Sequence, residues 1–203
     1  MLHLLTLAAT CAPSVAPVTM AAVVRQESGG DPFRIGINNG PPLVHQPLSR
    51  DEAAAAARAL LAAGYNVDLG LAQINSANLG WLGLSVDEVF DPCRNLTAAA
   101  VVLTACYERA LSDHAAGQPA LQAALSCYNT NSLSQGFANG YVQRVVSQSA
   151  AVVPAIDPAY PVPPAPKPSG GGSGIVLRPH GAGTPPSGRR VHGVEVLYGR
   201  SPR

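Results

Sequence analysis

The sequence predicts an all-α domain followed by a separate C-terminal segment. Helix start and stop signals recur through the first 150 residues. No stretch there alternates between apolar and polar side chains for long, so an extended sheet is not expected. Beyond residue 150 prolines become frequent and a Ser-Gly-rich run follows at 169–174, which is typical of a linker or a disordered tail. We therefore assign residues 1–150 to the domain and residues 151–203 to a Pro/Gly-rich, basic tail.

The N-terminal residues allow three interpretations. Residues 1–9 are apolar, but the run is short and no basic residues precede it. We favour the first turns of a domain helix. A remnant of a signal peptide that starts upstream is one alternative. A lipid anchor on Cys11 is the other, weakened because Thr10 stands where such sites have Gly or Ala.

The first long helix is predicted from local signals at both ends. Pro17 suits the first turn of a helix over residues 18–28, which Gly29 and Gly30 end. Glu27 then lies on the last turn, where the negative end of the helix dipole opposes ionisation of its carboxyl group. Burial acts in the same direction, so Glu27 could stay protonated near neutral pH and donate a proton. The alternative is a helix-end glutamate that faces water.

A capping box opens the second long helix. Ser49 and Glu52 have the spacing of such a box before a helix over residues 53–61, which closes at Gly64. The preceding residues 35–48 are expected to form a loop with room for a small hairpin. The same signals predict helices over residues 69–82, 95–111, 119–127 and 140–148, with a further capped turn at Ser85 and Glu88.

The charge distribution argues against several classes of function. Residues 1–150 carry seven Arg, no Lys and ten acidic residues, a net charge of −3; residues 151–203 carry six basic and two acidic residues, a net charge of +4, and the sum is the +1 of the whole chain. No basic stripe with interleaved aromatic residues indicates a nucleic-acid binder. No apolar run is long enough for a membrane span, and no ligand spacing predicts a metal or cofactor site.

The four cysteines are predicted to form two disulfides. They contain no Cys-x-x-Cys pair, which argues against zinc. Cys93 and Cys106 lie roughly 18 Å apart along the predicted helix, too far for a disulfide, which also removes the pairing of Cys11 with Cys127. Cys106 and Cys127 are nearly equidistant from the turn at 115–118, so they face each other in an antiparallel helical hairpin. We therefore expect Cys106–Cys127 and Cys11–Cys93, with buried free thiols as the alternative.

Three sequence blocks carry the chemistry. They are Glu27-Ser28-Gly29, then Gly70-Leu71-Ala72-Gln73-Ile74-Asn75 after Tyr65-Asn66-Val67-Asp68, and Tyr128-Asn129 followed by Tyr141-Val142-Gln143-Arg144. In this order and spacing they resemble the lytic transglycosylase domain, a lysozyme-like α fold that cleaves peptidoglycan. Residues 64–66 and 90–96 and the proline-rich extension are most similar to the transglycosylase component of type IV secretion systems. The resemblance covers roughly residues 8–148 and implies a lysozyme-like fold, α+β at most.

The resemblance also implies roles for individual residues. Glu27 matches the catalytic acid/base, and Tyr128 matches a tyrosine that reaches this glutamate. Ser28, Gln73, Asn75 and Asn129 match positions that bind the glycan. Without the resemblance, Gln73 and Asn75 would be a solvated helix face, and Tyr128-Asn129 a helix C-cap. The family often has Gly where this chain has Asn131, a residue type that can also adopt positive φ.

The mechanism implied by the resemblance uses one carboxylate. Glu27 acts as acid and then as base, while the 6-hydroxyl of N-acetylmuramic acid attacks its own C1 to give a 1,6-anhydro product without a cofactor. The implied setting is the periplasm, where the enzyme opens the cell wall for secretion or conjugation machinery that its tail contacts. Two alternatives remain: a hydrolytic muramidase that uses Asp68 as second carboxylate, and an inactive peptidoglycan-binding scaffold.

Overall fold

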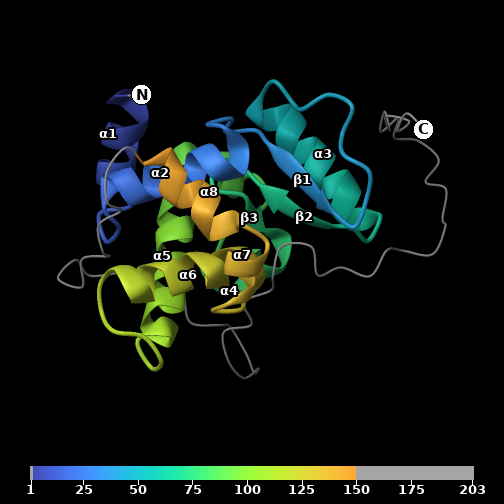
Figure 1. Ribbon diagram of the computed structural model, residues 1–203. Coiled ribbons are helices and arrows are strands. Elements are labelled where there is room, and N and C mark those ends of the chain that lie inside the picture. Colours follow the sequence, from blue (N-terminus) through green and yellow to red (C-terminus); the bar gives the residue numbers. More distant parts are fainter. Residues whose placement is uncertain (1, 150–203) are drawn as a thin grey trace.

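The computed structural model describes residues 2–149, which form a helical domain with a small sheet (Figure 1). The tail predicted over residues 151–203 lies outside the described residues. The α-helices are α1 (Leu2–Cys11), α2 (Pro17–Ser28), α3 (Arg50–Ala62), α4 (Leu79–Leu82), α5 (Pro92–Ala110), α6 (Gln118–Thr130), α7 (Gln135–Ala138) and α8 (Tyr141–Gln148). The strands are β1 (Ile35–Asn38), β2 (Asn66–Leu69) and β3 (Ile74–Asn75), and short 3-10 helices span Ser76–Asn78 and Glu88–Phe90. The predicted helical domain is confirmed, within the α+β limit that the resemblance set.

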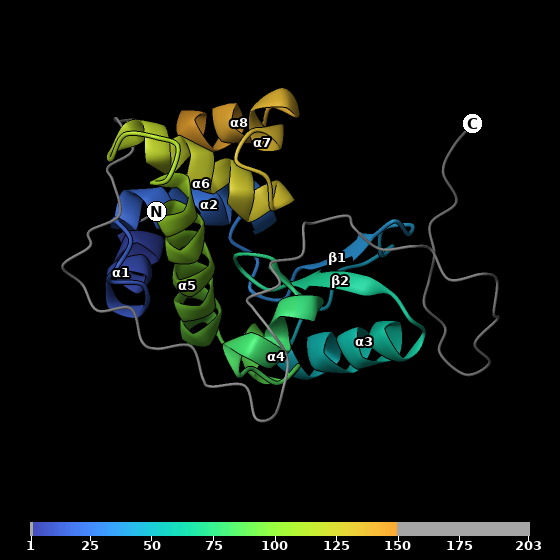
Figure 2. The ribbon, with the colours of Figure 1, turned by 90° about the horizontal axis from the view of Figure 1, so that it is seen from below.

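Helix α2 runs through the helical part of the molecule. Its first turn contains Pro17 as predicted, and it ends where Gly29 adopts a left-handed conformation with φ of 68°. The apolar residues of its middle, Met20 to Val24, are at most 1 % exposed. Figure 2 shows α1, α5, α6 and α8 grouped around this helix, with the sheet and α3 to one side. The core therefore holds the turn that carries Glu27.

The N-terminal residues form a domain helix, as we favoured. Ala8 is fully buried and Cys11 is 6 % exposed in the core. Cys11 is bonded to Cys93 with a Cα–Cα distance of 5.0 Å, so its sulfur is not available for a lipid. The lipid-anchor alternative is therefore wrong.

The sheet corrects two predictions. It has the order β1-β2-β3 with antiparallel pairs, so residues 35–38 pair with residues 66–69 and not with a neighbour inside the 35–48 loop. Residues 69–82 are not one helix. Strand β2 ends there, a turn with positive φ at Gly70 (77°) and Gln73 (51°) follows, and only residues 79–82 are α-helical. These strands were missed because each has four residues or fewer and its partner is remote in sequence.

The buried amide of Asn95 holds this turn in place. Its Nδ2 donates to the carbonyl oxygens of Leu69 (2.9 Å) and Val89 (2.8 Å), and its Oδ1 accepts from the backbone N–H of Ala72 (2.8 Å). Glycine is required at position 70 on two grounds: its φ is positive, and a Cβ there would clash with Asn95 Nδ2. Helix α5 begins earlier than predicted, at Pro92, because the side chain of Asp91 caps it, so Asn95 lies inside the helix.

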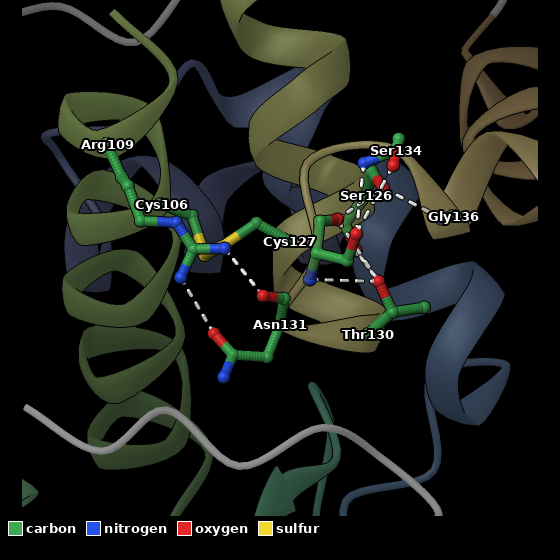
Figure 3. The surroundings of a disulfide bond; sticks show 9 residues. Cys106, Arg109, Ser126, Cys127, Thr130, Asn131, Ser134 and Gly136 are labelled. Atoms are coloured by element: carbon green, nitrogen blue, oxygen red, sulfur yellow. Dashed lines mark hydrogen bonds between the residues drawn. A yellow bond between two sulfur atoms is a disulfide. The ribbon is translucent and has the colours of Figure 1, made fainter. Parts of the chain in front are cut away.

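Both predicted disulfides are present. Cys11–Cys93 joins α1 to α5, and Cys106–Cys127 joins α5 to α6 with a Cα–Cα distance of 5.7 Å. Next to the second bond, Arg109 donates from Nη1 to Asn131 Oδ1 (2.8 Å) and from Nη2 to the Asn131 carbonyl (2.5 Å), as Figure 3 shows. Asn131 has φ of 57° and ends α6, so asparagine does take the left-handed position where the family often has glycine.

Ser126 fixes the chain that follows α6. Its hydroxyl donates to the carbonyl of Ser132 (2.6 Å). It also accepts from the backbone N–H of Gly136 (2.8 Å), as Figure 3 shows. A Cβ on Gly136 would lie 2.5 Å from the Ser126 Cα, so α7 packs against α6 at a distance that only glycine allows. This contact fixes the position of α7, the helix that directly precedes α8.

Candidate active site

Glu27 lies half-buried on the last turn of α2. The turn is held by Ser28, which is 8 % exposed. The Ser28 hydroxyl donates to the carbonyl of Val24 (3.3 Å) and accepts from the backbone N–H of Gly30 (3.1 Å). In the structure Ser28 therefore stabilises the helix end beside the carboxylate, and its predicted glycan contact stays a prediction.

Tyr141 forms a hydrogen bond with this carboxylate. Its hydroxyl donates to Glu27 Oε1 at 2.5 Å, and the residue is 2 % exposed. Tyr141 is the first residue of α8, placed there by Gly140 with φ of 75° and by Asn139, whose Oδ1 accepts from the Tyr141 N–H (2.9 Å). Tyr141 belongs to the third sequence block, but the sequence predicted no role for it. The sequence signal that could have identified Tyr141 is an aromatic residue directly after a glycine at the start of a helix.

Tyr128 approaches the same carboxylate from α6. It is 5 % exposed, and its hydroxyl donates to the carbonyl of Ala72 at 2.7 Å. Burial and then the charges of Glu27 and Asp68 raise the pKa of Tyr128 well above 10, so both carboxylates lie near this phenol. The structure thus brings Tyr128 close to Glu27 but directs its proton to the backbone. A catalytic role for Tyr128 stays a prediction.

The two phenols remain protonated at neutral pH. The pKa of Tyr141 is also well above 10, raised by burial first and then by the charge and the hydrogen bond of Glu27. A protonated phenol beside a carboxylate is a hydrogen-bond donor that favours the charged form of that carboxylate. The Tyr141 phenol is therefore suited to hold the Glu27 carboxyl group in a fixed orientation through a change of its protonation, whereas Tyr128 donates to the backbone.

The predicted glycan-binding amides are engaged within the protein. Gln73 is 6 % exposed, and its Nε2 donates to the carbonyls of Arg34 (3.0 Å) and Gly70 (2.9 Å). Asn129 is half-buried and accepts from Asn139 Nδ2 (2.9 Å). Neither Gln73 nor Asn75 lies on a solvated helix face, because Gln73 is in the turn and Asn75 in β3. Glycan binding by Gln73 and Asn129 stays a prediction.

Asn75 uses its whole hydrogen-bonding capacity. It is 2 % exposed, and its Nδ2 donates to Asn66 Oδ1 (2.6 Å) and Asp68 Oδ1 (2.8 Å). Its Oδ1 accepts from Asn66 Nδ2 (2.9 Å) and from the backbone N–H of Ala77 (3.0 Å). An amide has two donor hydrogens and two acceptor lone pairs, so in this conformation none remains for a sugar.

Asp68 is likewise held by amides. It is 6 % exposed; its Oδ1 accepts from Asn75, and its Oδ2 accepts from Asn38 Nδ2 at 2.9 Å. A carboxylate that receives such donors on both oxygens is a weak candidate for the base that takes a proton from water. The structure therefore places Asp68 near the site but in a network within the sheet.

A pocket of about 720 Å³ lies on another side of the α2 terminus. Its lining includes Leu4 and Leu7 of α1, Arg25 of α2 and Gln148 of α8, but neither Glu27 nor the two tyrosines. Arg25 Nη1 donates to the carbonyl of Gln148 at 2.8 Å across its edge. The pocket is therefore separate from the carboxylate and its phenols.

Residues 2–149 contain neither a candidate metal site nor a candidate membrane-spanning helix. No group of three or more His, Cys, Asp or Glu side chains in this range could hold a metal ion. Within the same range no helix has the length and apolar character needed to cross a membrane.

The comparisons with known proteins agree on one family. The family model of the transglycosylase SLT domain matches residues 5–148. The chain is 44 % identical over 168 residues to the "Type IV secretion system protein virB1" of Brucella suis biovar 1, covering 77 % of this chain and 70 % of that protein. The protein of the same name from Brucella abortus biovar 1 is 44 % identical over 155 residues (73 % and 65 %).

A further relative is more distant. The "Protein virB1" of Rhizobium radiobacter is 40 % identical over 146 residues, which is 72 % of this chain and 60 % of the relative. The chain thus spans about two thirds of the length of these relatives. No solved structure matches it. On the family match and these identities, the chain belongs to the transglycosylase SLT family.

Proposed function

We propose that this protein is a lytic transglycosylase that cleaves the β-1,4 bond between N-acetylmuramic acid and N-acetylglucosamine in peptidoglycan. The observation that carries the proposal is the Glu27 carboxylate on the last turn of a buried helix, held by the buried Tyr141 phenol at 2.5 Å. Membership of the transglycosylase SLT family supports the same activity.

One carboxyl group performs both proton transfers in this mechanism. Glu27 gives its proton to the glycosidic oxygen as the bond from that oxygen to C1 of N-acetylmuramic acid breaks. The 6-hydroxyl of the same sugar then bonds to C1 and returns its proton to Glu27. The product is a 1,6-anhydro sugar, and no water is consumed.

A hydrolytic muramidase is the second candidate. It would need a second carboxylate either as a nucleophile or as a base for water. Asp68 is near enough to Glu27 to act on the same phenol, but both its oxygens accept amide hydrogen bonds. This engagement favours the mechanism with one carboxylate.

Analysis of the products tests the proposal. Purified sacculi are digested with the full-length protein, and the soluble muropeptides are treated with borohydride and measured by mass spectrometry. We expect products that are one water lighter than hydrolytic ones and that borohydride does not reduce. Free reducing ends would contradict the transglycosylase and support the muramidase. Binding to sacculi without release of muropeptides would support the inactive scaffold.

Replacement of Tyr141 with Phe is expected to lower the rate of muropeptide release by about 10–100-fold, the loss associated with a hydrogen bond to a charged group. The phenol favours the ionised carboxylate, so its removal raises the pKa of Glu27 in the variant. Since Glu27 must start protonated, the alkaline limb of the pH–rate profile moves to higher pH. Rates measured across the pH range check both effects, and Tyr107→Phe on α5 is the matched control. An unshifted profile would contradict this role.

The setting we propose is the periplasm, next to a type IV secretion or conjugation apparatus. The names of the relatives support the secretion system. Two disulfides support an oxidising compartment, since such bonds are rare in the reducing cytosol. We propose that the tail, residues 151–203, contacts components of the apparatus, while the peptidoglycan strand is bound by residues of the domain.

A further inference from the structure

We propose that Asn38 and Asn66 form a binding site for an N-acetyl group of the glycan, beside the carboxylate of Glu27. The inference rests on the proposed function, because it names a contact of the same substrate. Neither residue was among the predicted glycan-binding positions.

The polar face of the sheet brings these amides together. Asn38 of β1 pairs in register with Asn66 of β2, and Asp68 of β2 pairs with Asn75 of β3. Residues two apart on a strand point to the same face, so Asn66 and Asp68 lie on one side together with their partners. The alternate residues of β2, Val67 and Leu69, point to the other face of the sheet, where their apolar side chains are fully buried.

Asp68 decides how the amides are oriented. An ionised carboxylate only accepts hydrogen bonds, so the amide nitrogens of both Asn38 and Asn75 must point toward it. Asn38 Nδ2 also donates to Asn66 Oδ1 at 2.6 Å. Both hydrogens of Asn38 are therefore used inside the network, and its Oδ1 is turned away from Asp68.

The hydrogen-bonding groups of this network are all used at Asn75, whereas some remain unused at Asn38 and Asn66. Asn75 makes four hydrogen bonds and is 2 % exposed, as described above. Among the described residues, Asn38 Oδ1 has no hydrogen-bond partner, and Asn66 Nδ2 donates only one of its two hydrogens, to Asn75. Asn38 and Asn66 are also the half-buried members of the group. One acceptor and one donor are thus presented side by side at a surface that solvent reaches.

An acetamido group complements this arrangement. It carries one N–H donor and one carbonyl acceptor, which match Asn38 Oδ1 and the second hydrogen of Asn66 Nδ2. Every sugar of the proposed substrate has such a group. The position is also suitable, because the Tyr128 hydroxyl donates to the carbonyl of Ala72 (2.7 Å), in the turn that joins β2 to β3. The charges of both Asp68 and Glu27 act on this phenol. The fixed amides need no reorientation on binding, which lowers the entropic cost of the contact.

Two oligosaccharides that differ in this group test the inference. Full-length protein with Glu27→Gln, which is expected not to turn over, is titrated with the β-1,4 tetramer of N-acetylglucosamine and with the β-1,4 tetramer of glucose, with NMR detection. The titrations are repeated after adding Asn38→Ala. The control adds Gln118→Ala, which removes a half-buried amide from the end of α6 remote from Tyr128.

We expect tighter binding of the acetylated tetramer, and a loss of about fivefold with Asn38→Ala for that tetramer alone, the size of one neutral hydrogen bond. The Gln118 variant should bind both tetramers unchanged. Equal weakening of both tetramers would mean that Asn38 only supports the sheet, and this or an unchanged affinity would overturn the proposal.

The proposed function has its own readout. The protein with native Glu27 is assayed for release of muropeptides from sacculi in parallel. If muropeptides are released but Asn38→Ala does not change the affinity for the acetylated tetramer, the proposed N-acetyl site is rejected and the proposed function is kept. If no muropeptides are released, the proposed function fails regardless of how the tetramers bind.

Discussion

Replacement of Glu27 with Gln is expected to abolish release of muropeptides from sacculi, with a loss of about a thousandfold or more. Glutamine has nearly the same shape, and its amide oxygen can still accept the Tyr141 hydroxyl that now donates to Glu27 Oε1 at 2.5 Å. It cannot give a proton to the glycosidic oxygen or take one from the 6-hydroxyl. The rate constant of muropeptide release, followed by liquid chromatography, measures the effect.

The control for this substitution removes a carboxylate elsewhere. Glu108→Gln changes the charge by the same amount on an exposed position of α5 and should leave the rate unchanged. Thermal unfolding of both variants should match that of the native protein, since neither change opens a cavity. An active Glu27→Gln protein would show that another group donates the proton, and would reject the mechanism proposed for Glu27.

Loss of the Cys11–Cys93 disulfide is expected to lower the free energy of unfolding by about 4.5 kcal/mol. The bond closes a chain segment with a sequence separation of 82, against 21 for Cys106–Cys127. In the chain-entropy view the longer loop stabilises more, and the shorter one contributes about 3.3 kcal/mol. Urea unfolding of the Cys11→Ala/Cys93→Ala protein, compared with the native protein, measures the first value. An unchanged midpoint would mean that this bond contributes no stability.

Peptide mapping without reduction verifies the pairing itself. Cleavage after Arg25, Arg58, Arg94 and Arg109 places each cysteine on a different tryptic peptide. We expect peptide 1–25 linked to 59–94, and 95–109 linked to 110–144. Reduced protein is the control, because it keeps every side chain and loses only the bonds. Any other linked pair would contradict the structure.

Local signals were sufficient for most helices. Ser49 accepts from the backbone N–H of Glu52 at 3.3 Å, and Glu52 accepts in return from the N–H of Leu48 at 2.8 Å, so the predicted capping box forms with its second bond moved by one residue. The box at Ser85 and Glu88 forms in both directions. Caps involve residues three or four apart, so they are readable from sequence.

The sheet was not readable in this way. Residues 66–69 become a strand because residues 35–38 lie beside them, and because Asn95, far along the chain, binds the turn that follows. Gln73 adopts φ of 51°, a conformation that few non-glycine residues take, and no feature of the neighbouring sequence predicts it. A strand of four residues is too short to show a clear alternation of apolar and polar side chains, and its own sequence does not reveal a pairing partner that lies far away in the chain.

The sequence by itself determined the helical domain, the Cys106–Cys127 pair and the position of Glu27 at a helix end, because each depends on spacing along one helix or one hairpin. The Cys11–Cys93 pair then followed by elimination. Tertiary structure alone decided which phenol donates to Glu27 and which amides are used within the sheet. Tyr141 and Glu27 meet at 2.5 Å only because α2 and α8 pack together. Asn75 of β3 uses its whole hydrogen-bonding capacity only because β2 pairs with β3 and places Asn66 and Asp68 beside it. Hydrogen bonds are short and directional, so their partners follow from the packing of remote elements and not from residue type.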